Sequence, residues 1–363
     1  MTNTRLRLCA QSRHSFIESW SGSTAWYGET GAQQGKTNKE QEMIMLPGRF
    51  SRYRRKLDWS LGMVLVLQLM VSGKADAQAV GALRGPYFGQ PSPGRTPALF
   101  VPERFRDPGE YHSPPVFSPD STEVYWTPMP GHGEPTTLMA RVVNGVWSDQ
   151  TYTNFGLEGG ATEVTFSPNG RRIFFLSRQR LAGEQSLPSH QRAPERIWYV
   201  DRTPDGFASP RPVGEPVWRH PTHWGLSVAS SGNLYFTSHA PEVNGQADIY
   251  MAPFDGTNWG EPRPLGPGVN SGVAENCPFI GPDESYLLFT RIDHANYNPD
   301  LFISHRLPDG SWSEAVPLPA PINSDVAETY AVVSPDGRYL FFLSWREGSG
   351  RPFWVETDFL RWR

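Results

Sequence analysis

The sequence predicts an all-β protein, folded as a closed β-propeller of about five four-stranded blades. A unit made of an apolar run, a tight turn and an aromatic strand recurs along residues 94–363. Its spacing of about 40 to 55 residues is typical of propeller blades. The composition agrees, because 35 glycines, 35 prolines and only 19% charged residues suit short strands joined by tight turns.

The recurring turn joins the first two strands of each predicted blade. Proline presets φ at the first turn position, Asp or Asn caps the turn, and glycine accepts a positive φ, so the flanking apolar strands fold back as a hairpin. Five copies are present, at Val116–Ser121, Thr165–Gly170, Ser227–Gly232, Phe279–Glu284 and Val332–Gly337.

Two further strands are predicted after each hairpin. The third strands are Leu138–Ala140, Ile197–Val200, Ile249–Met251, Leu301–Ile303 and Phe353–Val355. The fourth are Gly145–Ser148, Gly206–Pro210, Asn258–Pro262 and Gly310–Ser313. The fifth repeat has no fourth strand of its own before Arg363. We expect Thr96–Val101 to complete the last blade and so remove the exposed sheet edges.

The repeats also resemble a known family. Ser334-Pro-Asp-Gly337, Asp248-Ile-Tyr250, the Gly-x-Trp-Ser segments and the Asn-Ser pairs at 270–271 and 323–324 together look like the WD40-like repeats of TolB-type propellers. The pattern departs at Ser230-Ser231, where Pro-Asp is lost, and at the insertion from Arg178 to Glu195. The resemblance implies an interaction module of the bacterial envelope, and it keeps six blades as the alternative to five.

The N-terminal part has the features of an export signal. A cationic cluster at residues 52–56 precedes the apolar run Leu61–Val71 and the Ala75-Asp-Ala77 cleavage site. The run is shorter than the about 20 residues that span a bilayer. We therefore expect a signal peptide at 45–77, after a disordered extension or misassigned start at 1–44 and before a linker at 78–93. We expect the mature protein to be a periplasmic or secreted monomer with no stable membrane span. A retained N-terminal anchor is the alternative.

Charge and cysteine content exclude several classes of function. A formal net charge of -4 and a pI near 6.2 offer no basic field for nucleic acid. Cys9 lies upstream of the predicted cleavage site, and Cys277 stands in an apolar run where we expect a buried thiol. No disulfide framework or cysteine metal site can then form, and no cofactor is expected.

One aligned position carries candidate ligand-binding residues. Eight residues before the turn Asp, or its equivalent, the five repeats have His112, Ala161, His223, Glu275 and Glu328. This position enters the innermost strand, so the side chains should converge near the central channel, where His112, His223, Glu275 and Glu328 could hold a divalent metal or another ligand. His220 and Trp224 lie beside them in sequence. The alternative is structural, with the glutamates bonded to the backbone of a neighbouring blade.

Two functional hypotheses follow. The first is a non-catalytic binding scaffold of the cell envelope, which receives a protein, peptide or glycan at the channel face. The second is a metal-assisted glycan hydrolase or lyase with its site at the central channel. No nucleophile elbow or phosphate-binding glycine loop can be identified in the sequence, so the first hypothesis is favoured.

Overall fold

The computed structural model describes residues 82–100, 110–129, 136–185, 187, 192–204, 206–239, 246–292 and 298–358. All of them belong to the compact unit that contains Ala82–Arg363. The predicted extension at 1–44 and signal peptide at 45–77 lie outside the described residues, as do the first residues of the predicted linker.

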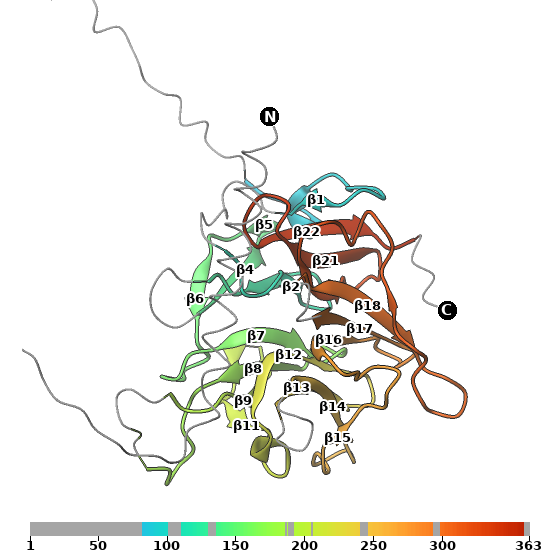
Figure 1. The fold of residues 1–363 in the computed structure, drawn as a ribbon. Helices are drawn as coiled ribbons and strands as arrows, with labels where there is room; N and C mark the ends of the chain where they lie inside the picture. Colours follow the sequence, from blue (N-terminus) through green and yellow to red (C-terminus); the bar gives the residue numbers. More distant parts are fainter. Residues whose placement is uncertain are drawn as a thin grey trace, which may run out of the picture. The chain divides into compact units, whose positions relative to one another are not determined.

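Five antiparallel sheets form a five-bladed β-propeller, as predicted (Figure 1). Blade 1 contains β2 (Val116–Phe117), β3 (Glu123–Trp126), β4 (Thr137–Val143), β5 (Val146–Trp147) and β6 (Thr151–Thr153). Blade 2 contains β7 (Thr162–Phe166), β8 (Arg172–Ser177), β9 (Arg196–Thr203), β10 (Gly206–Phe207) and β11 (Arg211–Pro212). Blade 3 contains β12 (Thr222–Val228), β13 (Leu234–Ser238), β14 (Asp248–Ala252) and β15 (Arg263–Pro264).

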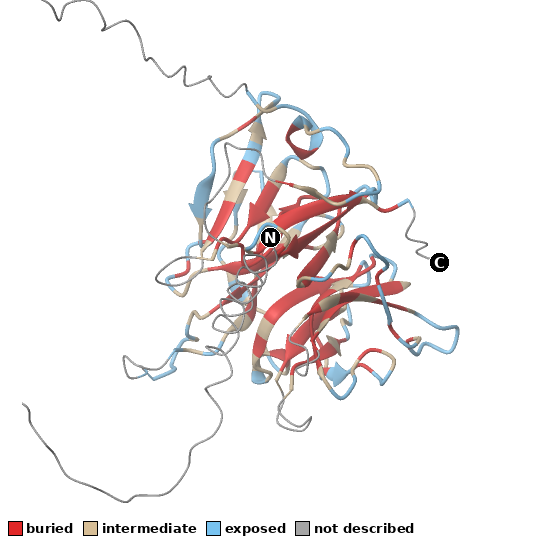
Figure 2. Cartoon of the chain, turned by 45° about the horizontal axis from the view of Figure 1, so that its top comes forward, coloured by how far each residue is buried: buried red, intermediate tan, exposed pale blue. Residues whose placement is uncertain are grey.

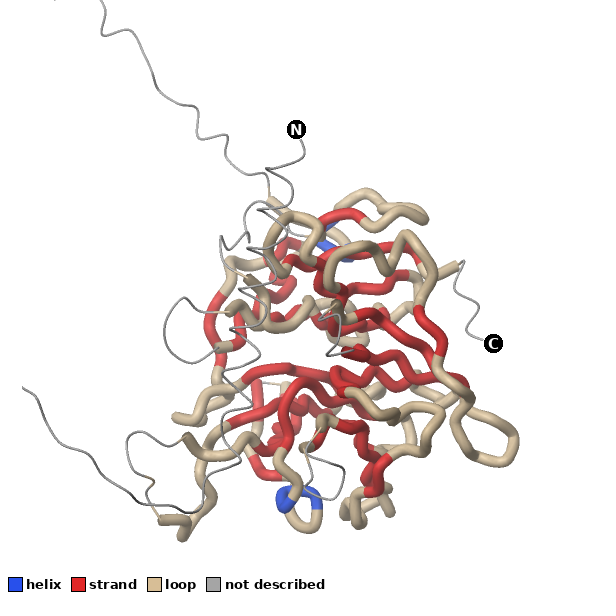
Figure 3. The backbone as a smooth tube through the Cα atoms, viewed as in Figure 1, coloured by secondary structure: helices blue, strands red, loops and turns tan. Residues whose placement is uncertain are grey.

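The last two blades complete the ring. Blade 4 contains β16 (Ala274–Ile280), β17 (Tyr286–Ile292), β18 (Asp300–His305) and β19 (Val316–Pro317). Blade 5 contains β20 (Glu328–Val333), β21 (Tyr339–Ser344), β22 (Arg351–Glu356) and the N-terminal strand β1 (Ala98–Leu99). In the described residues, helix is limited to the short 3-10 turns η1 (Pro86–Gly89) and η3 (Val217–Arg219) (Figure 3). None of these helices is long and apolar enough to cross a membrane.

The N-terminal strand closes the propeller, which confirms the prediction for Thr96–Val101. Ala98 pairs with Trp354 and Leu99 with Phe353, so β1 is the outer strand of blade 5. Phe100 then packs between blades, with its ring 4.8 Å from that of Phe341 and 6.0 Å from that of Phe117. The first and last blades are therefore joined both by backbone pairing and by an aromatic core.

The packed chain begins upstream of residue 94, within the predicted linker. Tyr87 and Phe88 are each only 5% exposed. The Tyr87 ring lies 5.0 Å from Phe117 of blade 1 and 5.1 Å from Tyr339 of blade 5. Both residues have a positive φ, a backbone conformation that costs about 1 to 2 kcal/mol per residue. Burial of two large rings in the seam offsets that cost.

The outermost strands of blades 3 and 4 differ from the prediction. The tryptophan segments at 258–262 and 310–313 do not form them, and contribute only the bridges Phe254–Trp259 and Arg306–Trp312. The strands are instead β15 and β19, a few residues further along the chain. Each ends in proline, which an outer strand tolerates because its N–H would face solvent. In blades 1 and 2, both the predicted segment and a later one pair with the third strand.

Buried strands fill the space between blades, and exposed residues gather in turns and outer strands (Figure 2). The once-per-blade tryptophans Trp147, Trp259 and Trp312 are 1%, 5% and 8% exposed. Trp259 of blade 3 lies 5.9 Å from Phe174 of blade 2, and Trp312 of blade 4 lies 6.4 Å from Tyr235 of blade 3. These residues pack between blades, as their register predicts.

Candidate functional site

The aligned position lies where predicted, at the entry to the inner strands. Glu328 opens β20, while Glu275 and His223 are the second residues of β16 and β12. Ala161 directly precedes β7. His112 lies shortly before β2, and its N–H donates to the carbonyl of Thr127 at 2.8 Å.

Just beyond this position, the inner strands of blades 2 to 5 each contain an irregularity in register. Blades 2, 4 and 5 each have one residue with a positive φ there, Glu163, Cys277 and Tyr330, and blade 3 has two, Trp224 and Gly225. Burial, and to a smaller extent the charge of Glu163, raises the pKa of both Cys277 and Tyr330. Glu163 thus lies close enough to Cys277 and Tyr330 for its charge to act on both, in keeping with bulges that re-aim side chains.

Threonines of the preceding blade hold three of these strained residues. In each case the backbone N–H donates to a threonine hydroxyl: Glu163 to Thr127 at 3.4 Å, Cys277 to Thr237 at 3.2 Å and Tyr330 to Thr290 at 3.0 Å. Blade 2 has Leu176 at the equivalent position, because Leu176 pairs with Thr162 as Thr290 pairs with Asn276. A leucine side chain cannot accept a hydrogen bond, so the backbone N–H at the bulge of blade 3 needs another acceptor.

Glu163 supplies that acceptor. Its Oε2 accepts the N–H of Gly225 in blade 3, and its Oε1 lies 2.7 Å from His112 Nε2 of blade 1. The Glu163 side chain is fully buried and that of His112 is 5% exposed. A Cβ at Gly225 would lie 2.8 Å from Cys277 Cα, so only glycine fits there. One buried carboxylate thus links blades 1, 2 and 3.

A second carboxylate pairs with the second histidine. Glu195, just before β9, bonds to Nδ1 of His223 in blade 3. Arg178 NH2 lies 3.4 Å from the other oxygen of Glu195. Arg178 and Glu195 are the two ends of the blade 2 insertion, so the insertion places both charges against blade 3. The side chains are 20% exposed for His223, 10% for Glu195 and 27% for Arg178.

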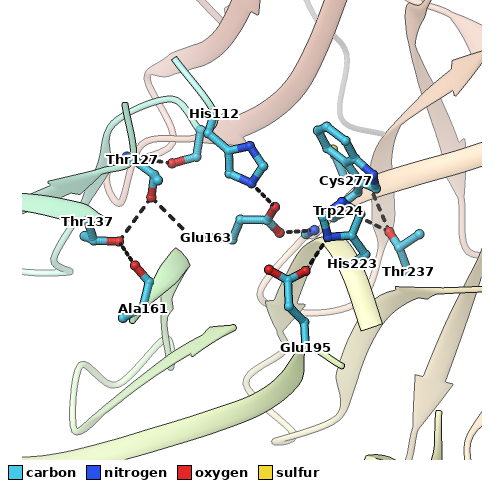
Figure 4. Close-up of polar contacts among 12 residues, drawn as sticks. His112, Thr127, Thr137, Ala161, Glu163, Glu195, His223, Trp224, Thr237 and Cys277 are labelled. Carbon is cyan, nitrogen blue, oxygen red and sulfur yellow. Dashed lines mark hydrogen bonds and ion pairs between the residues drawn. The ribbon is translucent and has the colours of Figure 1, made fainter. Parts of the chain in front are cut away.

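Trp224 packs against both His112 and His223 (Figure 4). Its ring centroid lies 5.2 Å from that of His112 and 4.6 Å from that of His223, and the two imidazoles are 6.4 Å apart. The Thr237 hydroxyl donates to the Trp224 carbonyl at 2.7 Å. We name His112, Glu163, Glu195, His223 and Trp224 the axial cluster.

Neighbouring charges raise the pKa of His112 and lower that of Glu195 in the axial cluster. Burial disfavours protonation of His112, but the hydrogen bond and charge of Glu163 outweigh it and raise the His112 pKa. Burial likewise disfavours ionisation of Glu195, yet the charge and hydrogen bond of His223, with Arg178, lower the Glu195 pKa to about 2. Burial and the charge of His223 lower the pKa of nearby His239 to about 4.

Glu275 and Glu328 are placed differently from the histidines. Both are fully buried, and each accepts hydrogen bonds from the N–H and hydroxyl of the serine four residues earlier, Ser271 or Ser324. Arg291 Nε lies 2.8 Å from Glu275, and Arg346 NH2 lies 3.2 Å from Glu328. The two glutamates therefore have a structural role at the entry to their own blades. This resembles the structural alternative given above, except that they bond to the preceding linker and not to the backbone of a neighbouring blade.

The predicted metal quartet is therefore not assembled. The residues described contain no group of three or more His, Cys, Asp or Glu side chains that could hold a metal ion. The two glutamates are directed to arginines of their own blades, and only the two histidines meet. His220 also lies apart from the axial cluster, with its ring 5.4 Å from that of Tyr250.

Sequence reasoning missed Glu163, Glu195, Arg178 and His239. Glu163 lies two residues after Ala161, the position in the aligned column that seemed empty. Arg178 and Glu195 are the first and last residues of the insertion that breaks the repeat pattern. The charged ends of this unusual loop were the sequence feature that could have indicated them.

Comparison with known proteins finds similar architecture among solved structures. A protein assigned as TolB from Agrobacterium tumefaciens is 16% identical, with a TM-score of 0.45, over 66% of this chain and 72% of that one. TolB from Acinetobacter baumannii is 16% identical, with a TM-score of 0.40, over 68% of this chain and about half of its own length, 54%. A gluconolactonase from Xanthomonas campestris is 10% identical, with a TM-score of 0.41, over 75% of this chain and 97% of that one.

No family model matches the chain, and no curated protein matches it. The similarity to solved structures is therefore a similarity of fold. The five sheets of the structure themselves agree with the propeller that the repeats predict.

Proposed function

We propose that this protein is an exported, non-catalytic binding scaffold of the cell envelope, and that its ligand binds beside the axial cluster. The observation that carries the proposal is the His223–Glu195–Arg178 arrangement, which joins two blades and keeps part of each side chain exposed. With a pKa of about 2, Glu195 stays ionised at neutral pH. It is thus a fixed hydrogen-bond acceptor, whereas a general acid or base needs a pKa near the working pH.

The charges of the axial cluster favour a neutral polar ligand. Each carboxylate is already paired with a cationic or imidazole group, so the cluster has little net attraction for an ion. It still presents donors and acceptors in fixed directions next to an aromatic ring. Vicinal hydroxyls of a glycan can use both kinds of group, which makes a neutral glycan the preferred ligand over a charged peptide.

A glycan array tests this proposal. The protein should bind neutral glycans, and Glu195→Gln and His223→Gln should weaken binding by about tenfold or more, as loss of a buried polar contact does. Val316→Ser, at an exposed position of β19, is the matched control and should bind as the wild type does. Equal binding by all four proteins would contradict the proposal.

The same glycans test the second candidate, a metal-assisted hydrolase or lyase. The observation that favours it is the part-exposed His223 imidazole oriented by Glu195, an arrangement that can support general-base chemistry. Product release measured with and without added Zn²⁺ or Ca²⁺ would support catalysis if it occurs and disappears in His223→Gln.

Export is tested on the mature N-terminus. Signal cleavage after Ala77 would leave a protein that begins at Gln78, in the periplasm or the medium. Mass spectrometry of protein recovered from those fractions measures the mass directly. A chain that retains residues 61–71 and sediments with membranes would instead indicate an N-terminal anchor.

A further inference from the structure

The outer side of blades 1 and 2 exposes large apolar side chains. Tyr152 of β6 is 72% exposed, Val143 at the end of β4 is 48% exposed, and Phe207 of β10 is 36% exposed. β6 lies on the outer side of β4, which also pairs with β3. The strand drawn in pale blue at the left of Figure 2, in the place of β6 in Figure 1, shows this exposure.

Arginines connect Val143 and Phe207 into one surface. Tyr152 is not part of it, because Tyr152 pairs with Leu138, three residues from Arg141, and therefore points from the opposite face of the sheet. Arg141 faces Glu123 across the β3–β4 ladder, and Glu123 Oε2 lies 3.0 Å from Arg202 NH2 of blade 2. Arg202 in turn faces Phe207 across the β9–β10 ladder. The Phe207 ring lies 5.2 Å from that of Phe155, which follows β6 by two residues.

Arg171 also belongs to this surface. Its carbonyl accepts the Arg202 N–H at 2.9 Å, so Arg171 lies directly opposite Arg202. We name this surface the blade 1–2 rim, and it comprises Arg141, Val143, Arg171, Arg202 and Phe207. It lies on the third strands β4 and β9, on β10 and in the turn before β8, whereas the axial cluster lies on the inner strands β7 and β12 and in the segments before β2 and β9.

The rim has an excess of positive charge on a chain whose net charge is -4. Arg141 and Arg171 are exposed, and neither makes an ion pair with any described residue. The neighbouring carboxylates are already engaged, Glu123 with Arg202, and Asp120 with Ser118 and Thr122. Exposed Phe and Arg side chains together are a composition that protein interfaces favour.

We propose that the blade 1–2 rim binds an acidic peptide segment of a partner protein. Apolar side chains of the segment would pack on Val143 and Phe207, and its carboxylates would take the unpaired guanidinium groups of Arg141 and Arg171. Guanidinium binds carboxylate in a bidentate manner, which gives direction as well as charge. The interleaving of apolar and cationic side chains favours a peptide over a lipid surface, where apolar anchors and charges separate by depth.

Selection of a random-peptide display library on the wild-type protein tests the proposal. Selected peptides should contain Asp or Glu beside an aromatic or aliphatic residue, and added salt should weaken their binding. The double variant Arg141→Glu/Arg171→Glu and the double variant Val143→Ser/Phe207→Ser should each lose about tenfold or more in affinity. All four positions are exposed, so both variants should melt as the wild type does.

Matched controls come from the other blades. Arg263→Glu and Leu307→Ser change exposed residues of the same types outside the rim and should leave peptide affinity unchanged. His223→Gln should also leave it unchanged, which separates this proposal from the glycan site. Peptides without acidic residues, peptides that bind the rim variants at full affinity, or arginine-dependent binding to phosphatidylglycerol vesicles in place of peptides would each overturn the proposal.

Discussion

The side chain at the start of the inner strand makes different contacts in blades 4 and 5 than in blades 1 to 3. In the former, a glutamate bonds to a serine of its own linker and to an arginine of its own blade. In blades 1 and 3, histidines take the same position and pair with carboxylates of blade 2, which itself has Ala161 there. The first arrangement serves one blade, while the second makes three blades depend on one another.

The two solutions also differ in how the carboxylates titrate. Burial raises the pKa of Glu275 and of Glu328, with the serine and arginine contacts only partly opposing it. The pKa of Glu195 is instead lowered to about 2, because His223 and Arg178 outweigh burial. Folding thus shifts Glu275 and Glu328 toward the neutral form and Glu195 toward the ionised form.

The largest expected effect is that of Glu163→Gln. It leaves His112 buried beside a neutral amide and weakens the bond to Gly225, and breaking a buried ion pair costs about 3 to 5 kcal/mol. Urea unfolding measures the loss. The double variant Glu163→Leu/His112→Leu, which removes both charges, should recover much of it, and no recovery would mean that packing and not charge links the blades.

The corresponding change in blade 4 should cost less. Glu275→Gln keeps an acceptor for Ser271, mimics the neutral form that burial favours, and leaves Arg291 with 20% of its side chain exposed to water. We expect a loss of about 1 kcal/mol by urea unfolding, typical of one hydrogen bond. A loss equal to that of Glu163→Gln would remove the difference between the two halves of the ring.

The pH dependence of stability sharpens the same comparison. The folded pKa of Glu195 lies below its ordinary value of 4.5, so its contribution is present above that value and lost as the pH falls toward about 2. His239, with a folded pKa of about 4, adds a loss between pH 6.5 and about 4, because the unfolded imidazole binds the proton more readily. His112 acts oppositely, and its contribution is lost as the pH rises above 6.5 through its raised pKa.

Unfolding free energies measured across this pH range should therefore pass through a maximum. Glu195→Gln should flatten the acid side below pH 4.5, and His239→Gln should flatten it between pH 6.5 and 4. An unchanged acid side in both variants would show that other carboxylates dominate acid unfolding.

The sequence predicted the repeating parts of the molecule and missed the parts that depend on neighbouring blades. The turns, the third strands and the closing strand near Ala98 follow from local patterns, and the structure confirms them. The outer strands β15 and β19 were misplaced because they are only two residues long and have no periodic signal. The Glu163–His112 contact joins residues far apart in sequence through a bulge, which side-chain periodicity does not reveal.

The smallest expected effect is that of Arg178→Gln, and it tests how Glu195 is held. The Arg178–Glu195 contact is long, at 3.4 Å, and part of the arginine is exposed, so its loss should cost less than about 1 kcal/mol at neutral pH. The acid side of the stability profile should still move to higher pH, because Arg178 is one of the charges that lower the Glu195 pKa. If it does not move, His223 alone keeps Glu195 ionised, and the insertion contributes no charge to the axial cluster.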